Sequence, residues 1–141
     1  SKAICVDVDE DIVEYARRIL SREFKKLSSR LLFLVADVAD LQVDGVDVVI
    51  MNPPFGVVKR NRGLDLLFLR KALLIGSSIY TIHKYSDGLN RIVGELVDNL
   101  GYNIIHRELL DFPIPMMFTM HRRKVYRVKT IFYVLRRGRL S

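Results

Sequence analysis

The chain has 141 residues, half of them hydrophobic, which suits one domain with a core of its own and excludes a globally disordered protein. It carries 23 Lys and Arg against 16 Asp and Glu, a formal charge of +7, and a single cysteine, which excludes an internal disulfide framework. Its apolar runs fall short of the roughly 20 residues that a membrane span needs, and its first residues lack the pattern of a secretion signal. These features predict a soluble, cytoplasmic protein whose residues 1–141 form a single domain.

The charge is unevenly distributed. Residues 1–47 hold 7 basic and 10 acidic side chains, whereas residues 48–141 hold 16 basic and 6 acidic ones. Residues 121–141 alone contain eight Lys and Arg and no acid. This segregation favours a polyanionic partner, with nucleic acid as the main candidate. The alternative is that the basic side chains only keep the protein soluble.

The first half of the sequence predicts three buried strands and one helix. The strands are residues 2–8, 31–36 and 46–51, whose continuous apolar runs suit parallel strands of a sheet that is covered on both faces. Asp9 is expected to cap a helix that runs to about Leu27. The apolar residues at helical spacing, which we expect to face the core, are Ile12, Ala16, Ile19, Leu20 and Phe24.

The second half continues the alternation of helices and strands. We expect a helix over 65–75 that Asp65 caps and Gly76 ends, a strand over 78–83, a helix from Ser86 to Gly101, and strands over 102–110 and 125–135. The last strand alternates polar and apolar residues, which indicates an antiparallel or more exposed strand. The whole order predicts an α/β fold with a mostly parallel sheet.

Polar residues follow two of the predicted strands. Asp7 ends the first strand, where a carboxylate can accept hydrogen bonds from the ribose hydroxyls of a nucleoside. Asp37 and Val38 end the second, where they could meet an exocyclic amine and a flat ring. The alternative is that these are ordinary polar residues of loops and helix starts.

The third strand leads into Asn52-Pro53-Pro54-Phe55-Gly56. The prolines fix the backbone and offer no N–H, so the Asn52 side-chain oxygen and the Pro53 carbonyl are both available to one outside donor. A primary amine on a planar group matches that pair of acceptors, and Phe55 offers a face on which the planar group can stack. The alternative is a proline-rich turn with a buried phenylalanine.

These features resemble the class I S-adenosylmethionine-dependent methyltransferases. The run VIMNPPFG, residues 49–56, is similar to the signature of enzymes that methylate amino groups of adenine, guanine or glutamine. The narrower resemblance is to the methyltransferase-like small-subunit rRNA adenine-N6 methyltransferases and their archaeal relatives. It lies in Asp65, Phe68, Leu69 and Ala72, in SIYTIHK at 78–84 and in FTMHRRK at 118–124.

The resemblance implies S-adenosyl-L-methionine as cofactor, no metal and no covalent intermediate. Asn52, Pro53, Pro54 and Phe55 would hold the target amine and base, which is turned out of its stack. The residues expected to bind the cofactor are Asp7, Val8, Asp37, Val38 and Asn52.

A second set of residues is expected to contact RNA. Two groups of them lie in predicted loops, while His83 and Lys84 stand at the carboxyl end of the predicted strand 78–83. The alternative for all of them is a solvated or polar loop. They are Lys59, Arg60, Arg62, His83, Lys84, His121, Arg122, Arg123 and Lys124. The resemblance also implies a small zinc-binding activator protein as partner.

The sequence departs from the family in one respect. No G-x-G motif occurs in the chain, and the strand, glycine-rich turn and helix that open such domains are absent. We therefore expect an N-terminally incomplete catalytic domain whose strands at 2–8 and 46–51 pair with each other, recruit another chain or cause aggregation. Three alternatives to adenine methylation remain: guanine-N2 methylation, glutamine methylation of protein, and a noncatalytic RNA-binding module.

Overall fold

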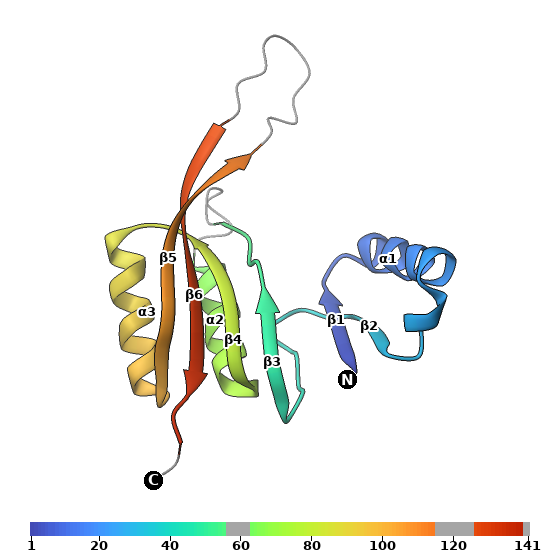
Figure 1. The fold of residues 1–141 in the computed structure, drawn as a ribbon, viewed down its shortest axis with the longest axis horizontal. Helices are drawn as coiled ribbons and strands as arrows, with labels where there is room; N and C mark the ends of the chain where they lie inside the picture. Colours follow the sequence, from blue (N-terminus) through green and yellow to red (C-terminus); the bar gives the residue numbers. More distant parts are fainter. Residues whose placement is uncertain (56–62, 115–125, 140–141) are drawn as a thin grey trace. The chain divides into compact units, whose positions relative to one another are not determined.

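The computed structural model describes residues 1–55, 63–114 and 126–139 (Figure 1). They fall into two compact units, residues 1–42 and 43–141. The order of helices and strands along the chain is the predicted one, with a short 3₁₀ helix added after the first α-helix. Division into two units gives each unit its own sheet.

The first unit is a parallel β-α-β arrangement. Strand β1 (Ala3–Asp7) pairs with β2 (Leu31–Val35), and helix α1 (Glu10–Glu23) with the 3₁₀ helix η1 (Lys25–Leu27) connects them. Asp9 caps α1 as predicted, because its side chain accepts hydrogen bonds from the backbone N–H groups of Asp11 and Ile12.

The buried face of α1 differs from the predicted one. Val13 and Leu20 are the buried residues of the helix, while Ile12 is 54% exposed and Phe24 is also exposed. Two strands cover only a narrow stripe of a helix, so residues at the margin of its apolar face stay in contact with water. Phe24 has left helical geometry and terminates α1, which explains why the helix is shorter than predicted.

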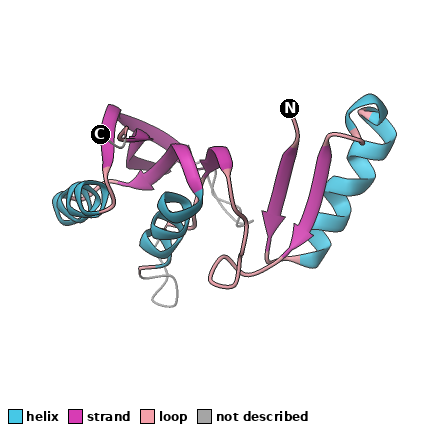
Figure 2. Cartoon of the chain, turned by 90° about the horizontal axis from the view of Figure 1, so that it is seen from below, coloured by secondary structure: helices cyan, strands magenta, loops and turns pink. Residues whose placement is uncertain are grey.

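The second unit contains a mixed four-stranded sheet in the order β3-β4-β6-β5. Strands β3 (Val46–Met51) and β4 (Gly76–Lys84) are parallel, and β6 (Tyr126–Arg137) is antiparallel to both β4 and β5 (Tyr102–Ile114). Helices α2 (Leu64–Ile75) and α3 (Asp87–Asn99) lie on the same face of this sheet (Figure 2). The antiparallel last strand is thus confirmed, but its central residues are buried because β6 is an inner strand.

The start of α2 corrects another prediction. Gly63 occupies the capping position with a φ of 76°, and no side chain caps the helix there. Asp65 lies inside the first turn and its carboxylate approaches His83 instead. A left-handed φ favours glycine, so the N-cap of α2 is Gly63 and not Asp65.

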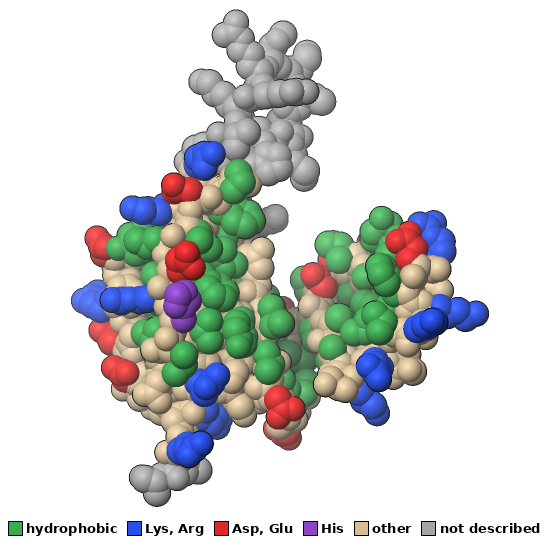
Figure 3. Space-filling view, viewed as in Figure 1, with side chains coloured by type: hydrophobic (Ala, Val, Ile, Leu, Met, Phe, Trp, Pro, Cys, Tyr) green, Lys and Arg blue, Asp and Glu red, His purple; other side chains and the backbone are tan. Residues whose placement is uncertain are grey.

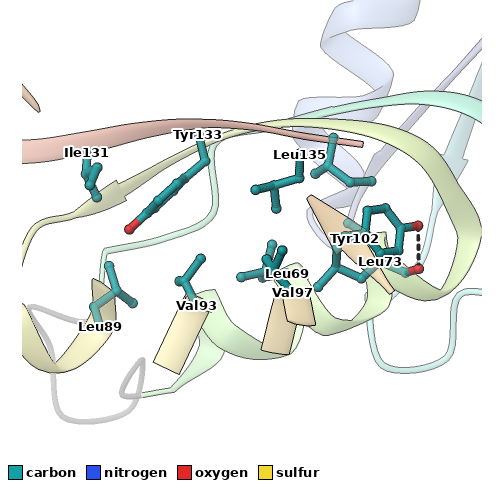
Figure 4. Close-up of a cluster of buried hydrophobic side chains, with 11 residues drawn as sticks. Leu69, Leu73, Leu89, Val93, Val97, Tyr102, Ile131, Tyr133 and Leu135 are labelled. Carbon is teal, nitrogen blue, oxygen red and sulfur yellow. Dashed lines mark hydrogen bonds between the residues drawn. The ribbon is translucent and has the colours of Figure 1, made fainter. Parts of the chain in front are cut away.

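The main core lies between the two helices and the sheet (Figure 4). Leu69 and Leu73 of α2 and Val93 of α3 face Tyr133 and Leu135 of β6. Ser86 caps α3 as predicted, which fixes the helix that supplies one wall of this core.

Tyr102 and Arg137 form hydrogen bonds to backbone carbonyls at the C-terminal end of α2, and we call this group the polar lock. The Tyr102 hydroxyl donates to the carbonyl oxygen of Leu73 at 2.7 Å and lies against that of Gly76. The Arg137 guanidinium donates to the same two carbonyls, at 3.1 and 3.0 Å, and lies over the Tyr102 ring. Carbonyls that a helix end leaves unpaired are thereby satisfied from β5 and β6.

Tyr102→Phe is expected to lower the free energy of unfolding by about 1–2 kcal/mol, because the buried hydroxyl contributes hydrogen bonds that Arg137 replaces only in part. Tyr15→Phe is the matched control, since Tyr15 is 61% exposed. Chemical denaturation of both variants tests the lock. Equal stability of the two would contradict it.

Strands β1 and β3 each keep one unpaired edge within the described ranges. β1 pairs only with β2, and β3 pairs only with β4, so the pairing of 2–8 with 46–51 that the sequence offered as one outcome does not occur. Ile50 of β3 is 82% exposed, and hydrophobic side chains gather on the sheet face opposite the helices (Figure 3). None of the described helices is long and apolar enough to cross a membrane.

Candidate active site

The predicted amine clamp directly follows β3. Asn52 is exposed, Pro53 is fully buried, and Pro54 and Phe55 are half-buried. Burial of Pro53 anchors the turn in the protein, while the Asn52 side chain remains accessible to an outside molecule. An acceptor that is both exposed and held by a rigid neighbour is suited to orient an N–H donor.

A buried polar group lies where β4 runs beside this turn. Thr81 is the ladder partner of Met51, the residue before Asn52. The Thr81 Oγ1 lies 2.9 Å from His83 Nε2, and His83 Nδ1 lies 3.6 Å from an Asp65 carboxylate oxygen. These residues connect the carboxyl ends of β3 and β4 with the first turn of α2. Sequence spacing carried no signal for this group, since it forms only when the sheet brings the three residues together.

The predicted contact of His83 with RNA is wrong for this structure. The side chain of His83 is 0% exposed and packs edge-on against Tyr133. Burial lowers its pKa below the ordinary value, and the nearby Asp65 carboxylate opposes that shift only in part. The sequence placed His83 at the carboxyl end of the predicted strand 78–83, near the presumed site, whereas the structure buries its side chain against Tyr133 and beside Asp65. Lys84, the next residue, is exposed and stays available for RNA.

Because the pKa of His83 is lowered in the folded protein, we expect the free energy of unfolding to decrease as the pH falls below 6.5. Above pH 6.5, the ordinary value, His83 is neutral in both the folded and unfolded chains, so its contribution is fully present. Below that pH the unfolded chain takes up a proton that the folded protein excludes, at a slope of up to about 1.4 kcal/mol per pH unit. The loss continues until the pH reaches the folded-state pKa.

Denaturation at pH 7.5 and 5.5 measures this slope. His83→Gln should make it shallower, and His106→Gln is the control because His106 is exposed. An identical slope in the wild type and in His83→Gln would contradict the assignment.

Four of the five predicted cofactor residues lie at the carboxyl ends of β1 and β2, and the fifth is Asn52 after β3. Asp7 accepts a hydrogen bond from the Asp9 N–H and Asp37 accepts one from the Ala39 N–H, each through one carboxylate oxygen. Both aspartates are exposed, as is Val8, and Val38 is half-buried. A hollow of about 160 Å³ adjoins Asp7; Cys5, Val6, Asp7, Ile12, Val13, Ala16 and Phe33 line it.

This arrangement fits the adenosine part of S-adenosylmethionine. Two accessible carboxylates at the ends of neighbouring parallel strands can accept hydrogen bonds from ribose hydroxyls and from an amino group. The apolar hollow beside Asp7 can receive a flat or aliphatic group. Among the described residues, no three His, Cys, Asp or Glu side chains gather in a way that could hold a metal ion.

Seven of the residues predicted to contact RNA lie outside the described part of the structure: Lys59, Arg60, Arg62, His121, Arg122, Arg123 and Lys124. Their assignment stays a prediction.

Comparison with known proteins adds relatives in sequence and in structure. No protein-family model matches the chain. It is 34% identical over 143 residues to the protein MJ0284 of Methanocaldococcus jannaschii, covering 94% of this chain and 62% of that one. It is 28% identical over 135 residues to the rRNA N(6)-adenosine-methyltransferase METTL5 of Danio rerio, covering 92% of this chain and 62% of the relative.

The fold points in the same direction. The crystal structure of PH1948 from Pyrococcus horikoshii, a proposed RNA methyltransferase, matches with a TM-score of 0.75 and 28% identity, covering 97% of this chain and 64% of that one. The chain is similar in sequence to an rRNA N(6)-adenosine-methyltransferase and in fold to a methyltransferase. The resemblance seen in the sequence is thereby confirmed, and the α/β fold is the Rossmann-like methyltransferase fold.

The chain spans about three fifths of the length of the curated relatives reported above. More distant proteins of the same fold include S-adenosylmethionine-dependent methyltransferases and one methyltransferase bound to S-adenosyl-L-homocysteine. These proteins share the fold of this chain, and S-adenosylmethionine, which the sequence resemblance implied, enters the function proposed below.

Proposed function

We propose that this protein is the catalytic part of an S-adenosylmethionine-dependent methyltransferase that modifies the exocyclic amino group of adenine in RNA, small-subunit rRNA in particular, in the cytoplasm. The observation that carries the proposal is the exposed Asn52 beside the buried Pro53, at the carboxyl end of a parallel strand. Homology to rRNA N(6)-adenosine methyltransferases supports the same reaction.

The chain's own residues would position the acceptor. S-adenosylmethionine supplies a methyl group on a positively charged sulfur, which is already electrophilic. The Asn52 side-chain oxygen and the Pro53 carbonyl each accept one N–H of the amine and direct its lone pair along the line of transfer. Phe55 stacks on the base, and Asp7 and Asp37 hold the adenosine of the donor. The proton that the amine loses leaves to water.

A nucleobase is favoured over a protein glutamine as the target by two features. Phe55 offers an apolar ring to a flat base, and the net charge of +7 suits a polyanionic substrate better than a protein glutamine. The METTL5 relative of Danio rerio is an rRNA N(6)-adenosine-methyltransferase by name, which favours adenine over guanine. A noncatalytic RNA-binding module is the remaining alternative, which the same net charge also suits.

Methyl transfer with an isotope-labelled donor tests the proposal. The substrates are small-subunit rRNA, the same rRNA pre-methylated at adenine N6, and a glutamine peptide. Label in N6-methyladenosine after nuclease digestion is the expected result. Label in N2-methylguanosine or in the peptide would replace adenine by the corresponding target. Donor binding by calorimetry without transfer to any substrate would favour the noncatalytic module.

The basic segment at 122–124 gives a separate prediction. Neutralising Arg122, Arg123 and Lys124 together should weaken binding to every RNA alike, because phosphate contacts carry no sequence information. Each lost contact should reduce the slope of log affinity against log salt by slightly less than one. The measurement is RNA affinity over a range of salt concentrations. An unchanged slope would mean that the three side chains are only solvated.

The resemblance also leads us to propose a small zinc-binding activator protein as a partner at a sheet edge. Copurification of a zinc-containing protein with the tagged chain, lost on adding a competing strand peptide, is the expected outcome.

A further inference from the structure

The first unit carries a concentration of positive charge that its net charge conceals. Between Arg17 and Arg30 the sequence holds six Lys and Arg and a single acid, whereas most of the acids of residues 1–42 precede Arg17. All six side chains are exposed. We call this surface of α1, η1 and the turn after it the basic strip; it comprises Arg17, Arg18, Arg22, Lys25, Lys26 and Arg30.

The strip has a hollowed surface on α1. An open depression of about 350 Å³ is lined by Glu14, Arg17, Arg18, Ser21 and Arg22. These side chains are spaced three and four residues apart and therefore share one face. Lys and Arg side chains are visible on the surface of this unit in Figure 3.

Most of this charge is not neutralised within the described residues. Arg17 pairs with Glu14 at 3.0 Å and Arg22 with Glu23 at 2.7 Å, and both pairs are largely exposed to solvent. Arg18, Lys25, Lys26 and Arg30 form no ion pair in the described ranges. Exposed pairs are weak, so even Arg17 and Arg22 can exchange their partners for a phosphate at little cost.

Stabilisation of the helix does not account for the strip. The favourable effect of cations on a helix dipole is confined to the last turn, where α1 has only Arg22. Arg17 and Arg18 precede that turn, and the remaining three cations follow the helix. A membrane surface is also a poor match, because the apolar face that an interfacial helix would insert is occupied by the packing of Val13 and Leu20.

An exposed aromatic side chain accompanies the cations. Tyr15 is 61% exposed and precedes Arg18 and Arg22 by three and seven residues, which places it beside them on the helix. Cations that surround an accessible aromatic ring are the combination with which proteins hold single-stranded nucleic acid, through phosphates and a stacked base.

We propose that the basic strip is a second RNA-binding surface, at which Arg18, Lys25 and Lys26 contact phosphates and Tyr15 stacks on an unpaired base. The inference rests on RNA being the substrate of the proposed function. It assigns to residues 15–30 a role in holding the RNA that is separate from the clamp at Asn52.

The test uses matched charge reversals in the 141-residue chain. The strip variant is Arg18→Glu, Lys25→Glu and Lys26→Glu. The control is Arg70→Glu, Arg91→Glu and Arg139→Glu, three exposed residues of the second unit that give the same change in net charge. Fluorescence anisotropy measures affinity for a single-stranded RNA over a range of salt concentrations, and circular dichroism checks that each variant is folded.

The strip variant should bind RNA at least tenfold more weakly, with a salt slope reduced by about 2, since each phosphate contact on a single strand contributes about 0.7. The control should change affinity less than threefold. Equal losses in the two variants would overturn the proposal. If charge reversal disturbs α1, the substitution of the same three residues by alanine provides the comparison, and an unchanged slope there overturns the proposal as well.

Tyr15→Ala separates stacking from charge. It should weaken the binding of single-stranded RNA about fivefold or more and leave duplex RNA unaffected, because duplex bases are not available to the ring. Equal effects on both would remove Tyr15 from the site. If the strip variant loses binding to an acidic polyglutamate peptide but not to RNA, the strip is a surface for acidic proteins and the proposal fails.

Methylation is measured on the same samples. If RNA binding depends on the basic strip but no methyl transfer occurs, the proposed function is wrong and the RNA-binding role of the strip stands. If methyl transfer occurs but RNA binding does not depend on the strip, the proposed function stands and the RNA-binding role of the strip is wrong.

Discussion

Asn52→Ala should abolish methyl transfer and leave RNA affinity nearly unchanged. The amide oxygen accepts from the reacting amine, so its interaction is strongest where the new bond forms, whereas the phosphates are held elsewhere. Because Asn52 is exposed, its loss should not disturb folding. Single-turnover methylation and RNA binding are the two measurements.

Asn99→Ala is the matched control for this change, since Asn99 is exposed at the end of α3. It should retain full activity. If Asn52→Ala keeps more than about a tenth of the activity, the lost transition-state stabilisation is less than about 1.4 kcal/mol. That result would contradict the role of Asn52 in holding the target amine.

Leu73→Ala is expected to lower the free energy of unfolding by about 3 kcal/mol, because it removes a buried side chain and leaves a cavity between α2 and β6. Leu73 is 1% exposed, and its neighbour Leu74 is 58% exposed on the same helix. Leu74→Ala makes the same chemical change and should cost less than about 1 kcal/mol. Urea denaturation compares the two, and similar losses would place Leu73 outside the core.

The order of helices and strands could be predicted from hydrophobic periodicity and capping residues. Asp9 and Ser86 cap the helices that were expected of them, because a cap depends on residues only two or three positions away. The position of β6 between β4 and β5 could not be predicted in this way. Strand neighbours are decided by packing over the whole chain, and so the burial of Tyr133 was missed.

The candidate site shows the same division between local and long-range information. The turn at Asn52–Phe55 is local, and prolines restrict it in any context. His83 was misplaced because its burial depends on α2 and β6, which are distant in sequence. Asp65 looked like a helix cap in the sequence, but its partner is 18 residues away, and only the fold brings the two together. The basic strip could have been found in the sequence, but the charge of residues 1–47 was summed as a whole, and the acids that precede the strip concealed it.

The position of β6 has a consequence for synthesis of the protein. β4 emerges from the ribosome long before the strand that will lie between it and β5. At ordinary rates of translation, the roughly fifty residues from Lys84 to Arg137 take roughly 3–10 s to add. Throughout that interval Ile79 and Leu69 lack the cover of Tyr133 and Leu135. A nascent chain that exposes an apolar sheet edge for seconds is a client for chaperones, and its yield in cells should depend on them.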